Sequence, residues 1–127
     1  MPGRQLIMSF PVTATSHAMP DYRARGGYGA LAKTLGQMKP QDVVKEVTAS
    51  GLQGRGGAAF AVGRKWQVVQ YDDGQPHYLI ANADEGEPGT FKDRFYLERD
   101  PHRFLEGMLI AASAVGIAKI YIYLRDE

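Results

Sequence analysis

Apolar positions in the first half of the chain recur at the spacing of two amphipathic helices. Residues 28–35 carry their apolar side chains on one face, which predicts a short helix that ends at Gly36. Residues 40–50 repeat the pattern, with three valines along one face. Pro40 suits a first helical position and Gly51 is typical of a helix end, so we expect the second helix between them. Both helices are expected to pack into a core.

In the second half of the chain, two apolar runs flank one long helical pattern. Residues 78–81 form a short apolar run that is typical of a buried strand. Asp100 and Pro101 suit the start of the longest helix, whose apolar stripe ends at Gly116. Residues 119–124 are apolar or aromatic on both faces, as in a strand covered on both sides within a parallel sheet. Strand, helix and strand therefore predict one βαβ unit.

Two segments between these elements are less regular. Residues 60–69 fit either a helix or a turn that leads into a strand. Thr90 and Asp93 match a capping box, so a short helix is expected to begin at Phe91.

The predicted elements indicate the α/β fold class, with the parallel βαβ unit inside a Rossmann-like layered domain. Residues 1–20 contain three prolines and no sustained helical or strand periodicity, and we interpret them as an extended N-terminal arm. Residues 21–127 form the domain. Because a parallel sheet of two strands is not a stable unit, we expect a truncated domain, the N-terminal part of a longer protein.

Composition excludes several classes of function. The chain has 127 residues, 44% hydrophobic and 23% charged, which suits one globular domain. The net charge of +1 gives no bulk field for a nucleic acid or an anionic membrane. No apolar run approaches the roughly 20 residues of a membrane span, and no signal peptide is recognisable. The absence of cysteine excludes thiolate-held iron–sulfur clusters within this chain. We expect a cytoplasmic setting.

Histidines and arginine–glycine motifs add no function. His17, His77 and His102 have no mutual spacing suited to a metal, and His102 is expected at the surface of its helix. The tripeptide Arg-Gly-Gly occurs at residues 25–27 and again at 55–57. RNA-binding boxes are clustered, strongly basic repeats, so we predict no nucleic-acid role.

Residues 51–57 place four glycines in seven positions, which is costly in conformational entropy. Such loops often bring backbone N–H groups close to an anion, most often a phosphate. Arg55 in the loop and Lys65 downstream would add positive charge. The alternative is an ordinary flexible turn. The loop matches neither a P-loop nor the dinucleotide fingerprint, because no Gly-Lys-Ser/Thr follows and it precedes the predicted strand.

Three carboxylates, Asp84, Glu85 and Glu87, follow the first predicted strand in a loop stiffened by Pro88 and two glycines. In open α/β sheets, ligands bind beyond the carboxyl ends of the strands, so we expect a polar ligand here. A hard cation is an alternative, but the loop lacks the regular alternation of oxygen ligands found in calcium loops. We predict no metal. The two loops together suit a nucleotide-like cofactor, with the phosphate on one side and the hydroxyls and ring edge on the other.

Three motifs carry a family resemblance: Gly-Leu-Gln-Gly-Arg-Gly-Gly-Ala-Ala-Phe at 51–60, Gly-Arg-Lys-Trp at 63–66, and the loop 82–94. In order and spacing they resemble the NADH-oxidising, FMN-binding subunit of respiratory complex I. The same subunit type occurs in soluble NAD-linked hydrogenases and in formate dehydrogenases. The resemblance covers about residues 22–127 and makes the domain part of an FMN- and NADH-binding domain.

The resemblance implies hydride transfer between NAD(H) and FMN, with electrons passed to iron–sulfur clusters in partner subunits. It implies no direct membrane insertion, and a [4Fe–4S] cluster only in a C-terminal part beyond this chain. We expect no catalytic side chain, because the flavin carries out the chemistry and the protein supplies orientation and electrostatics. The implied FMN residues are Gly54, Arg55, Gly56, Lys65, Asn82, Asp84 and Glu85. Gly57, Phe60 and Glu87 would face NADH, with Glu87 orienting it.

The chain departs from the family pattern in three places. Ala-Phe-Ala-Val-Gly at residues 59–63 replaces the usual Gly-Phe-Pro-Thr-Gly. Val68 stands where complex I members often have an aromatic residue for the adenine. The ending at residues 121–127 is more similar to the formate dehydrogenase branch, chiefly through Asp126. We therefore expect a formate dehydrogenase or a complex I-type enzyme. The rival hypothesis is a catalytically incomplete fragment that serves only as a subunit-interaction piece.

Overall fold

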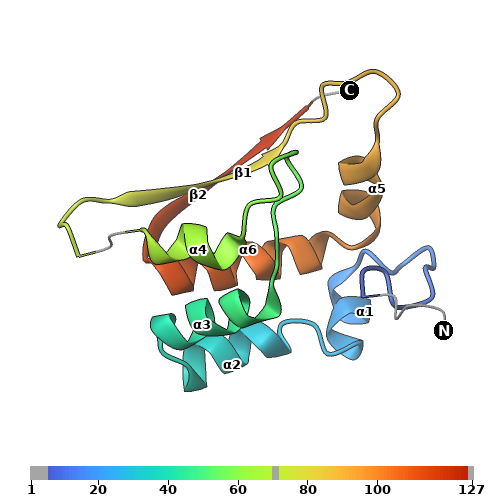
Figure 1. Ribbon diagram of the computed structural model, residues 1–127. Helices are drawn as coiled ribbons and strands as arrows, with labels where there is room; N and C mark the ends of the chain where they lie inside the picture. The colour runs from blue at the N-terminus through green and yellow to red at the C-terminus, as the bar shows by residue number, and fades with distance from the viewer. Residues whose placement is uncertain (1–5, 70–71, 126–127) are drawn as a thin grey trace.

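The computed structural model describes residues 6–69 and 72–125, which form six helices and two strands (Figure 1). Helices α2, α3, α4 and α6 lie on one side of the two-stranded sheet, and α5 stands near the end of the strands (Figure 1). The elements are, in chain order, α1 (Met19–Ala24), α2 (Gly29–Gln37), α3 (Pro40–Ser50), α4 (Val62–Gln67), β1 (His77–Ala83), α5 (Lys92–Arg99), α6 (Pro101–Val115) and β2 (Ile117–Leu124).

The two strands are parallel, and α6 packs against β2. Their register pairs Tyr78 with Lys119 near the start and Ala83 with Leu124 at the end. The predicted βαβ unit and the α/β class are confirmed. Because both strands end at the same edge, the residues that follow Ala83 and those that follow Leu124 start from neighbouring positions.

Proline and glycine fix the ends of the two longest helices as predicted. Helix α3 begins at Pro40 and is capped at its C-terminus by Gly51, which has a φ of 69°. Helix α6 begins at Pro101 and is capped at its C-terminus by Gly116, which has a φ of 68°. Glycine reaches this left-handed region without a Cβ penalty, and proline supplies a helical φ where no N–H is needed.

Helix α2 differs from its prediction at both ends. Gly36 lies inside the helix, which continues to Gln37, and Tyr28 precedes it in a left-handed conformation with a φ of 64°. The predicted apolar face is also wrong, because Leu35 is 66% exposed while Thr34 is buried. The hydroxyl of Thr34 donates to the carbonyl of Ala30 at 2.9 Å, so this polar side chain is satisfied within its own helix.

The predicted capping box at α5 is wrong. The helix begins at Lys92, and no side chain of the preceding residue caps it. The carboxylate of Glu85 accepts the backbone N–H of Arg94 at 3.2 Å instead. Asp100 likewise does not cap α6; its carboxylate accepts hydrogen bonds from Arg25 and from Arg103, at 3.4 and 2.8 Å.

The core lies where α3, α4 and α6 meet. Val43, Ala114 and Val115 are its buried centre. Gly63 lets α4 approach α3 closely, because a Cβ at this position would stand 2.6 Å from the Cα of Thr48. Partly buried apolar residues complete the cluster: Met38, Val44, Trp66, Val69, Ile110 and Ile117.

One face of the sheet is open, contrary to the prediction that β2 is covered on both sides. Tyr121 and Tyr123 are 49% and 59% exposed, and Ile80 of β1 is 70% exposed. The register places Ile80 beside Tyr121, so these side chains share a face. The helices that contact the sheet lie on the other side (Figure 1), so the apolar pattern here is not matched by packing within the described residues.

The described part of the N-terminal arm, residues 6–18, is folded into turns and does not run straight. The N–H of Thr13 donates to the Ser16 hydroxyl at 2.6 Å, and the guanidinium of Arg25 lies 3.7 Å from the centre of the Phe10 ring. Helix α1 already begins at Met19. Residues 1–5 lie outside the described part, and the domain boundary near residue 20 stays a prediction.

A buried carboxylate, Glu106 of α6, joins three segments of the chain. It accepts the hydroxyl of Tyr22 and the backbone N–H groups of Tyr28 and Leu31, the last two at 2.9 and 3.1 Å. A negative charge at the N-terminus of α2 is also favoured by the helix dipole. Burial raises the pKa of Glu106, but these hydrogen bonds outweigh burial and lower it overall. Burial and the neighbouring carboxylate raise the pKa of Tyr22.

His102 belongs to the same cluster, so its prediction as a surface residue is wrong. It is half-buried, stacks on Tyr22 with ring centres 5.6 Å apart, and is hydrogen-bonded through Nδ1 to the hydroxyl of Tyr28 at 2.8 Å. The sequence pattern placed it in a first helical turn but gave no sign of the tyrosines that pack over it.

Candidate functional site

The glycine-rich segment forms a narrow hairpin between α3 and α4. Gln53 pairs with Ala61 in an antiparallel bridge, and the N–H of Gly54 donates to the carbonyl of Phe60 at 2.9 Å. A second bond joins the N–H of Val62 to the carbonyl of Leu52, also at 2.9 Å. The hairpin rises from α3 to the height of the sheet in Figure 1. Residues 54–60 are therefore held as a defined loop. Of the two structures expected for residues 60–69, a helix or a turn, the structure shows a helix, α4, at Val62–Gln67.

Backbone conformation at the tip of this loop explains part of its glycine content. Gly57 has a φ of 102°, and no atom lies within 4 Å of a Cβ added to Gly56 or Gly57. Ala59 also takes a left-handed conformation, with a φ of 47°. This is the position where the family pattern has glycine, so alanine here carries strain on the order of 1–2 kcal/mol. Open space beside the backbone is what an approaching ligand requires.

Positive charge gathers beside the hairpin. The ammonium of Lys65 and the guanidinium of Arg64, both on α4, lie 5.6 and 5.8 Å from the centre of the Phe60 ring. Phe60 is 43% exposed, and Arg55 is exposed in the loop itself. Val68, a departure from the family pattern, is exposed at the end of α4. A group of cations beside an exposed loop suits a phosphate.

The acidic loop follows β1, which extends through Asn82 to Ala83. The N–H of Asp84 donates to the side-chain oxygen of Asn82 at 3.0 Å, so Asn82 turns the chain out of the strand. Further on, the N–H of Thr90 donates to the carbonyl of Glu87 at 3.2 Å. Pro88 and Gly89, the latter with a φ of 78°, supply the central residues of a type II turn.

Glu85 is fixed from two sides within this loop. One carboxylate oxygen, Oε1, accepts the N–H of Arg94 at 3.2 Å, and its backbone carbonyl accepts the guanidinium of Arg125 at 3.3 Å. The other oxygen, Oε2, is buried and has no hydrogen-bond partner. A buried carboxylate oxygen without a donor is costly. Glu85 is therefore suited to accept a hydrogen bond from a ligand.

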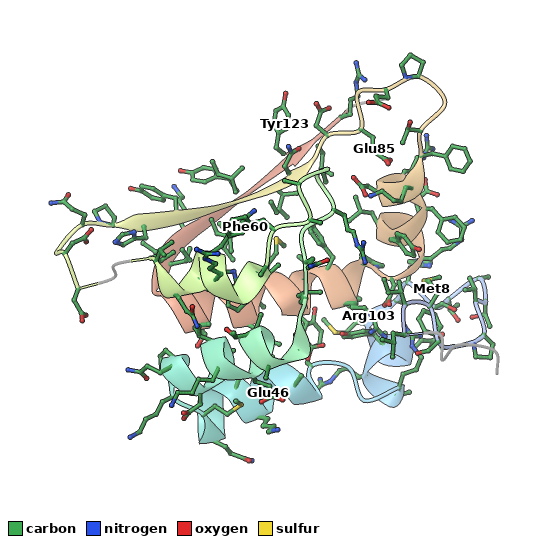
Figure 2. All side chains as sticks on the ribbon, in the orientation of Figure 1. Met8, Glu46, Phe60, Glu85, Arg103 and Tyr123 are labelled. Atoms are coloured by element: carbon green, nitrogen blue, oxygen red, sulfur yellow. The ribbon has the colours of Figure 1, made fainter. Side chains whose placement is uncertain are left out.

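A hollow of about 820 Å³ lies between the acidic loop, α5 and the end of β2. Glu85 and Glu87 line it, whereas Asn82 and Asp84 do not. None of its lining residues comes from the glycine hairpin. Phe60 and Glu85 mark the hairpin and the acidic loop in Figure 2. The predicted site residues thus form two groups, one around the hairpin and Lys65 and one in the acidic loop.

Charged side chains on α5 form pairs beside the hollow. The guanidinium of Arg94 lies 2.7 Å from the carboxylate of Glu98, and its hydrogen bond lowers the pKa of Glu98. The ammonium of Lys92 pairs with the carboxylate of Asp93, which raises the pKa of Lys92. Arg94 and Arg125 are site residues that the sequence pattern did not single out. The signal for Arg125 was its place directly after β2, at the edge where β1 also ends.

The residues present fit a flavin nucleotide. The hairpin offers cations and open space beside Gly56 and Gly57 for a phosphate, and the unpaired Oε2 of Glu85 offers an acceptor for an N–H or hydroxyl donor. Among the described residues, no three histidine or acidic side chains are grouped to hold a metal ion. No helix in the described ranges is long and apolar enough to cross a membrane.

Comparison with known families tests the family resemblance that the three sequence motifs carry. Residues 47–127 match the family described as the Nuo51 FMN-binding domain, and this range contains both the glycine hairpin and the acidic loop. The chain belongs to this family. The resemblance expected from the three sequence motifs is confirmed.

Curated relatives in the family are subunits of NADH-quinone oxidoreductases. The chain is 51% identical over 111 residues to such a subunit of Rhizobium meliloti, a match that covers 87% of this chain and 26% of the relative. It is 49% identical to the corresponding subunit of Aquifex aeolicus over 87% of this chain, and 44% identical to that of Escherichia coli over 86%. These matches cover 26% and 25% of those two relatives, so the chain spans about a quarter of the curated relatives' length.

Solved structures of an NAD⁺-reducing [NiFe]-hydrogenase share the fold. The H2-reduced form matches with a TM-score of 0.62 and 48% identity, over 68% of this chain and 15% of that chain. The air-oxidized form matches with a TM-score of 0.65 and 38% identity, over 91% of this chain and 19% of that chain. The fold of this chain therefore occurs in both quinone-linked and hydrogenase enzymes.

Proposed function

We propose that the chain is the N-terminal part of an FMN-binding subunit that transfers a hydride between NAD(H) and FMN. The observation that carries the proposal is the family match over residues 47–127, which contains both candidate loops. The relatives named above are NADH-quinone oxidoreductase subunits and an NAD⁺-reducing hydrogenase. The buried oxygen of Glu85 that has no partner also supports a ligand site in the acidic loop, because a ligand could supply the missing donor.

The glycine hairpin would bind the FMN phosphate. Gly54, Arg55 and Gly56 belong to the loop, and Lys65 stands beside it on α4. Guanidinium and ammonium groups bind phosphate through charge-assisted hydrogen bonds, and open backbone N–H groups add to them. The proposed role of this group is to hold and orient the cofactor.

The acidic loop would contact the rest of the cofactor. Asn82, Asp84 and Glu85 would accept hydrogen bonds from the ribityl hydroxyls and the flavin ring, which is consistent with the unpaired Oε2 of Glu85. Glu87 would orient NADH from the same loop. Bound FMN supplies the redox chemistry, because it takes a hydride and releases electrons one at a time.

Phe60 and Gly57 would face NADH from the hairpin side. Phe60 is partly exposed beside two cations, so its ring can contact a ligand while the cations attract phosphate. The positive φ of Gly57 leaves its backbone accessible. These residues would exclude water from one side of the nicotinamide and leave the transfer of the hydride to the flavin.

The proposed partners are iron–sulfur subunits of a multi-subunit dehydrogenase, in a cytoplasmic or cytoplasm-facing complex. The names of the relatives, which are subunits of NADH-quinone oxidoreductases, support this. Assignment to a formate dehydrogenase in particular stays a prediction. That prediction depends on the ending at residues 121–127, of which Asp126 and Glu127 lie outside the described residues.

The rival function is an interaction piece without catalysis, and one observation favours it. Exposed aromatic and aliphatic side chains, including Tyr121 and Ile80, form a bare face on the sheet that further protein could cover. Flavin binding separates the two. An interaction piece would bind no FMN, whereas the proposed flavin subunit would bind it.

The test uses the complete polypeptide that the gene encodes. Wild type is expected to bind FMN and to reduce ferricyanide with NADH. Arg55→Ala is expected to weaken FMN binding about tenfold or more, since a charge-assisted hydrogen bond is worth roughly 1.5–3 kcal/mol. Arg23→Ala, which removes an exposed cation from α1, is the matched control and should bind FMN normally. Unchanged affinity in Arg55→Ala would overturn the phosphate role. A wild type without flavin or activity would overturn the function.

The 127 residues alone are expected to bind FMN weakly at best. The hollow beside the acidic loop is lined by that loop, α5 and the end of β2, and the hairpin contributes no lining residue. Tight, stoichiometric quenching of flavin fluorescence by the isolated chain would contradict this expectation.

A further inference from the structure

The ends of β1 and β2 are joined through one side chain. Arg125 directly follows β2, and its guanidinium donates to the backbone carbonyl of Glu85, two residues beyond β1, at 3.3 Å. The register that pairs Ala83 with Leu124 brings these positions together, although they are 40 residues apart in the chain. The contact therefore depends on the completed βαβ unit.

The same guanidinium also lies close to Gly86 of the acidic loop. At Gly86, an added Cβ would lie 3.5 Å from Nη1 of Arg125 and 3.9 Å from Oδ2 of Asp84. Both distances are those of ordinary van der Waals contacts, so the guanidinium packs beside Gly86. The guanidinium thus lies beside the backbone of the acidic loop at residues 85–86.

A second contact completes the fixation of Glu85. The N–H of Arg94, in the first turn of α5, donates to Oε1, so the backbone and the side chain of Glu85 are each held by a different element. With both held, Oε2 stays buried and unpaired. Without the bond to Arg125, the backbone at Glu85 could rotate and expose that oxygen to water.

We propose that Arg125 is a positioning residue for the cofactor: it holds the acidic loop at Glu85, so that the buried oxygen stays available to a ligand. This rests on the proposed function. Arg125 need not touch the cofactor, because it acts through Glu85. Its contribution is preorganisation, which raises affinity by lowering the cost of ordering the loop on binding.

The first experiment compares FMN affinity in the complete polypeptide with Arg125→Gln. We expect the dissociation constant for FMN to rise about threefold to tenfold, as for the loss of one exposed hydrogen bond. Arg125→Lys keeps the charge and one donor and should lose less. Lys119→Gln is the matched control, because it removes a cation from the same strand at the end opposite the loop. Equal affinity in wild type, Arg125→Gln and Arg125→Lys would overturn the proposal.

The second experiment has a readout that needs no cofactor. Hydrogen exchange of the Arg94 amide reports the bond to Glu85, and we expect it to accelerate in Arg125→Gln but not in Lys119→Gln. An unchanged exchange rate of the Arg94 amide would overturn the proposal that Arg125 holds the acidic loop at Glu85. If Arg125→Gln does not fold, Arg125→Lys decides: weaker FMN binding at an unchanged melting temperature supports the role, and unchanged binding overturns it. A wild type that binds no FMN would instead count against the proposed function, and amide exchange would still test the tether.

Discussion

The carboxylate of Glu85 accepts the backbone N–H of Arg94 at 3.2 Å, so a residue of the acidic loop caps helix α5. Only one oxygen is used, and the other is buried without a partner. The same side chain thus serves the fold through Oε1, while Oε2 is an acceptor without a donor from the protein. The two roles can be separated by substitution.

Glu85→Gln should separate them. Glutamine keeps an oxygen for the Arg94 N–H but replaces the unpaired oxygen with an amide donor, which cannot accept from a ligand. FMN affinity in the complete polypeptide should fall about tenfold or more, because a mismatched buried polar group costs roughly 1–3 kcal/mol. The melting temperature should barely change. Glu98→Gln, which lines the same hollow, is the control and should bind FMN as wild type. Normal FMN binding by Glu85→Gln would contradict the role of Oε2.

Ala59→Gly should stabilise the folded chain. The φ of 47° at Ala59 is unfavourable for a residue with a Cβ, and glycine removes that strain, worth about 1 kcal/mol after its own entropy cost. Urea unfolding monitored through Trp66 measures the change. Ala58→Gly, at the neighbouring position without a positive φ, should lower stability by roughly 0.4–1 kcal/mol. Equal effects of the two substitutions would be inconsistent with strain at Ala59.

Gly63→Ala should destabilise the core. The new Cβ would stand 2.6 Å from the Cα of Thr48 and 2.2 Å from its hydroxyl oxygen, so α3 and α4 must separate. Overpacking of this kind costs about 1–3 kcal/mol, measured by urea unfolding. Gly36→Ala is the matched control, because it lies inside α2 with no atom within 4 Å of the added Cβ. It should raise stability by up to about 1 kcal/mol. Tolerance of Gly63→Ala would contradict the close packing of α3 and α4.

Glu106 should make stability depend on pH in the acidic range. Its pKa is lower in the folded chain than the ordinary value of 4.5, so the unfolded chain binds more protons there. The stabilisation is complete above that value and is lost as the pH falls through the lower folded value. Urea unfolding at a series of acidic pH values should give a flatter dependence for Glu106→Gln than for wild type. If the free energy of unfolding depended on pH equally in the two proteins, Glu106 would not be the cause of the pH dependence.

Local chemistry explains what the sequence could predict of the fold. Proline and glycine mark helix ends wherever they occur, so the ends of α3 and α6 were predicted from single residues. The parallel pairing of the strands followed from two apolar runs with a helix between them. The same reasoning failed at Gly36 of α2, because the residue type alone does not distinguish a glycine inside a helix from one that ends it.

Long-range contacts account for what the sequence did not predict. Tyr22 and Glu106 are 84 residues apart in the chain, and Glu85 and Arg125 are 40 residues apart. No local sequence spacing predicts either contact. At α5, a carboxylate nine residues before Arg94 took the place of the predicted cap. Sequence motifs predict the candidate site residues, and the roles of these residues toward FMN and NADH stay predictions.

The most direct test of the central claim is the flavin content of the complete polypeptide, followed by anaerobic titration with NADH. We predict about one FMN released per chain on denaturation and bleaching of the bound flavin by NADH, with Arg55→Ala holding much less flavin than the Arg23→Ala control. A folded wild-type polypeptide that binds no FMN, or whose bound FMN is not reduced by NADH, would contradict the account.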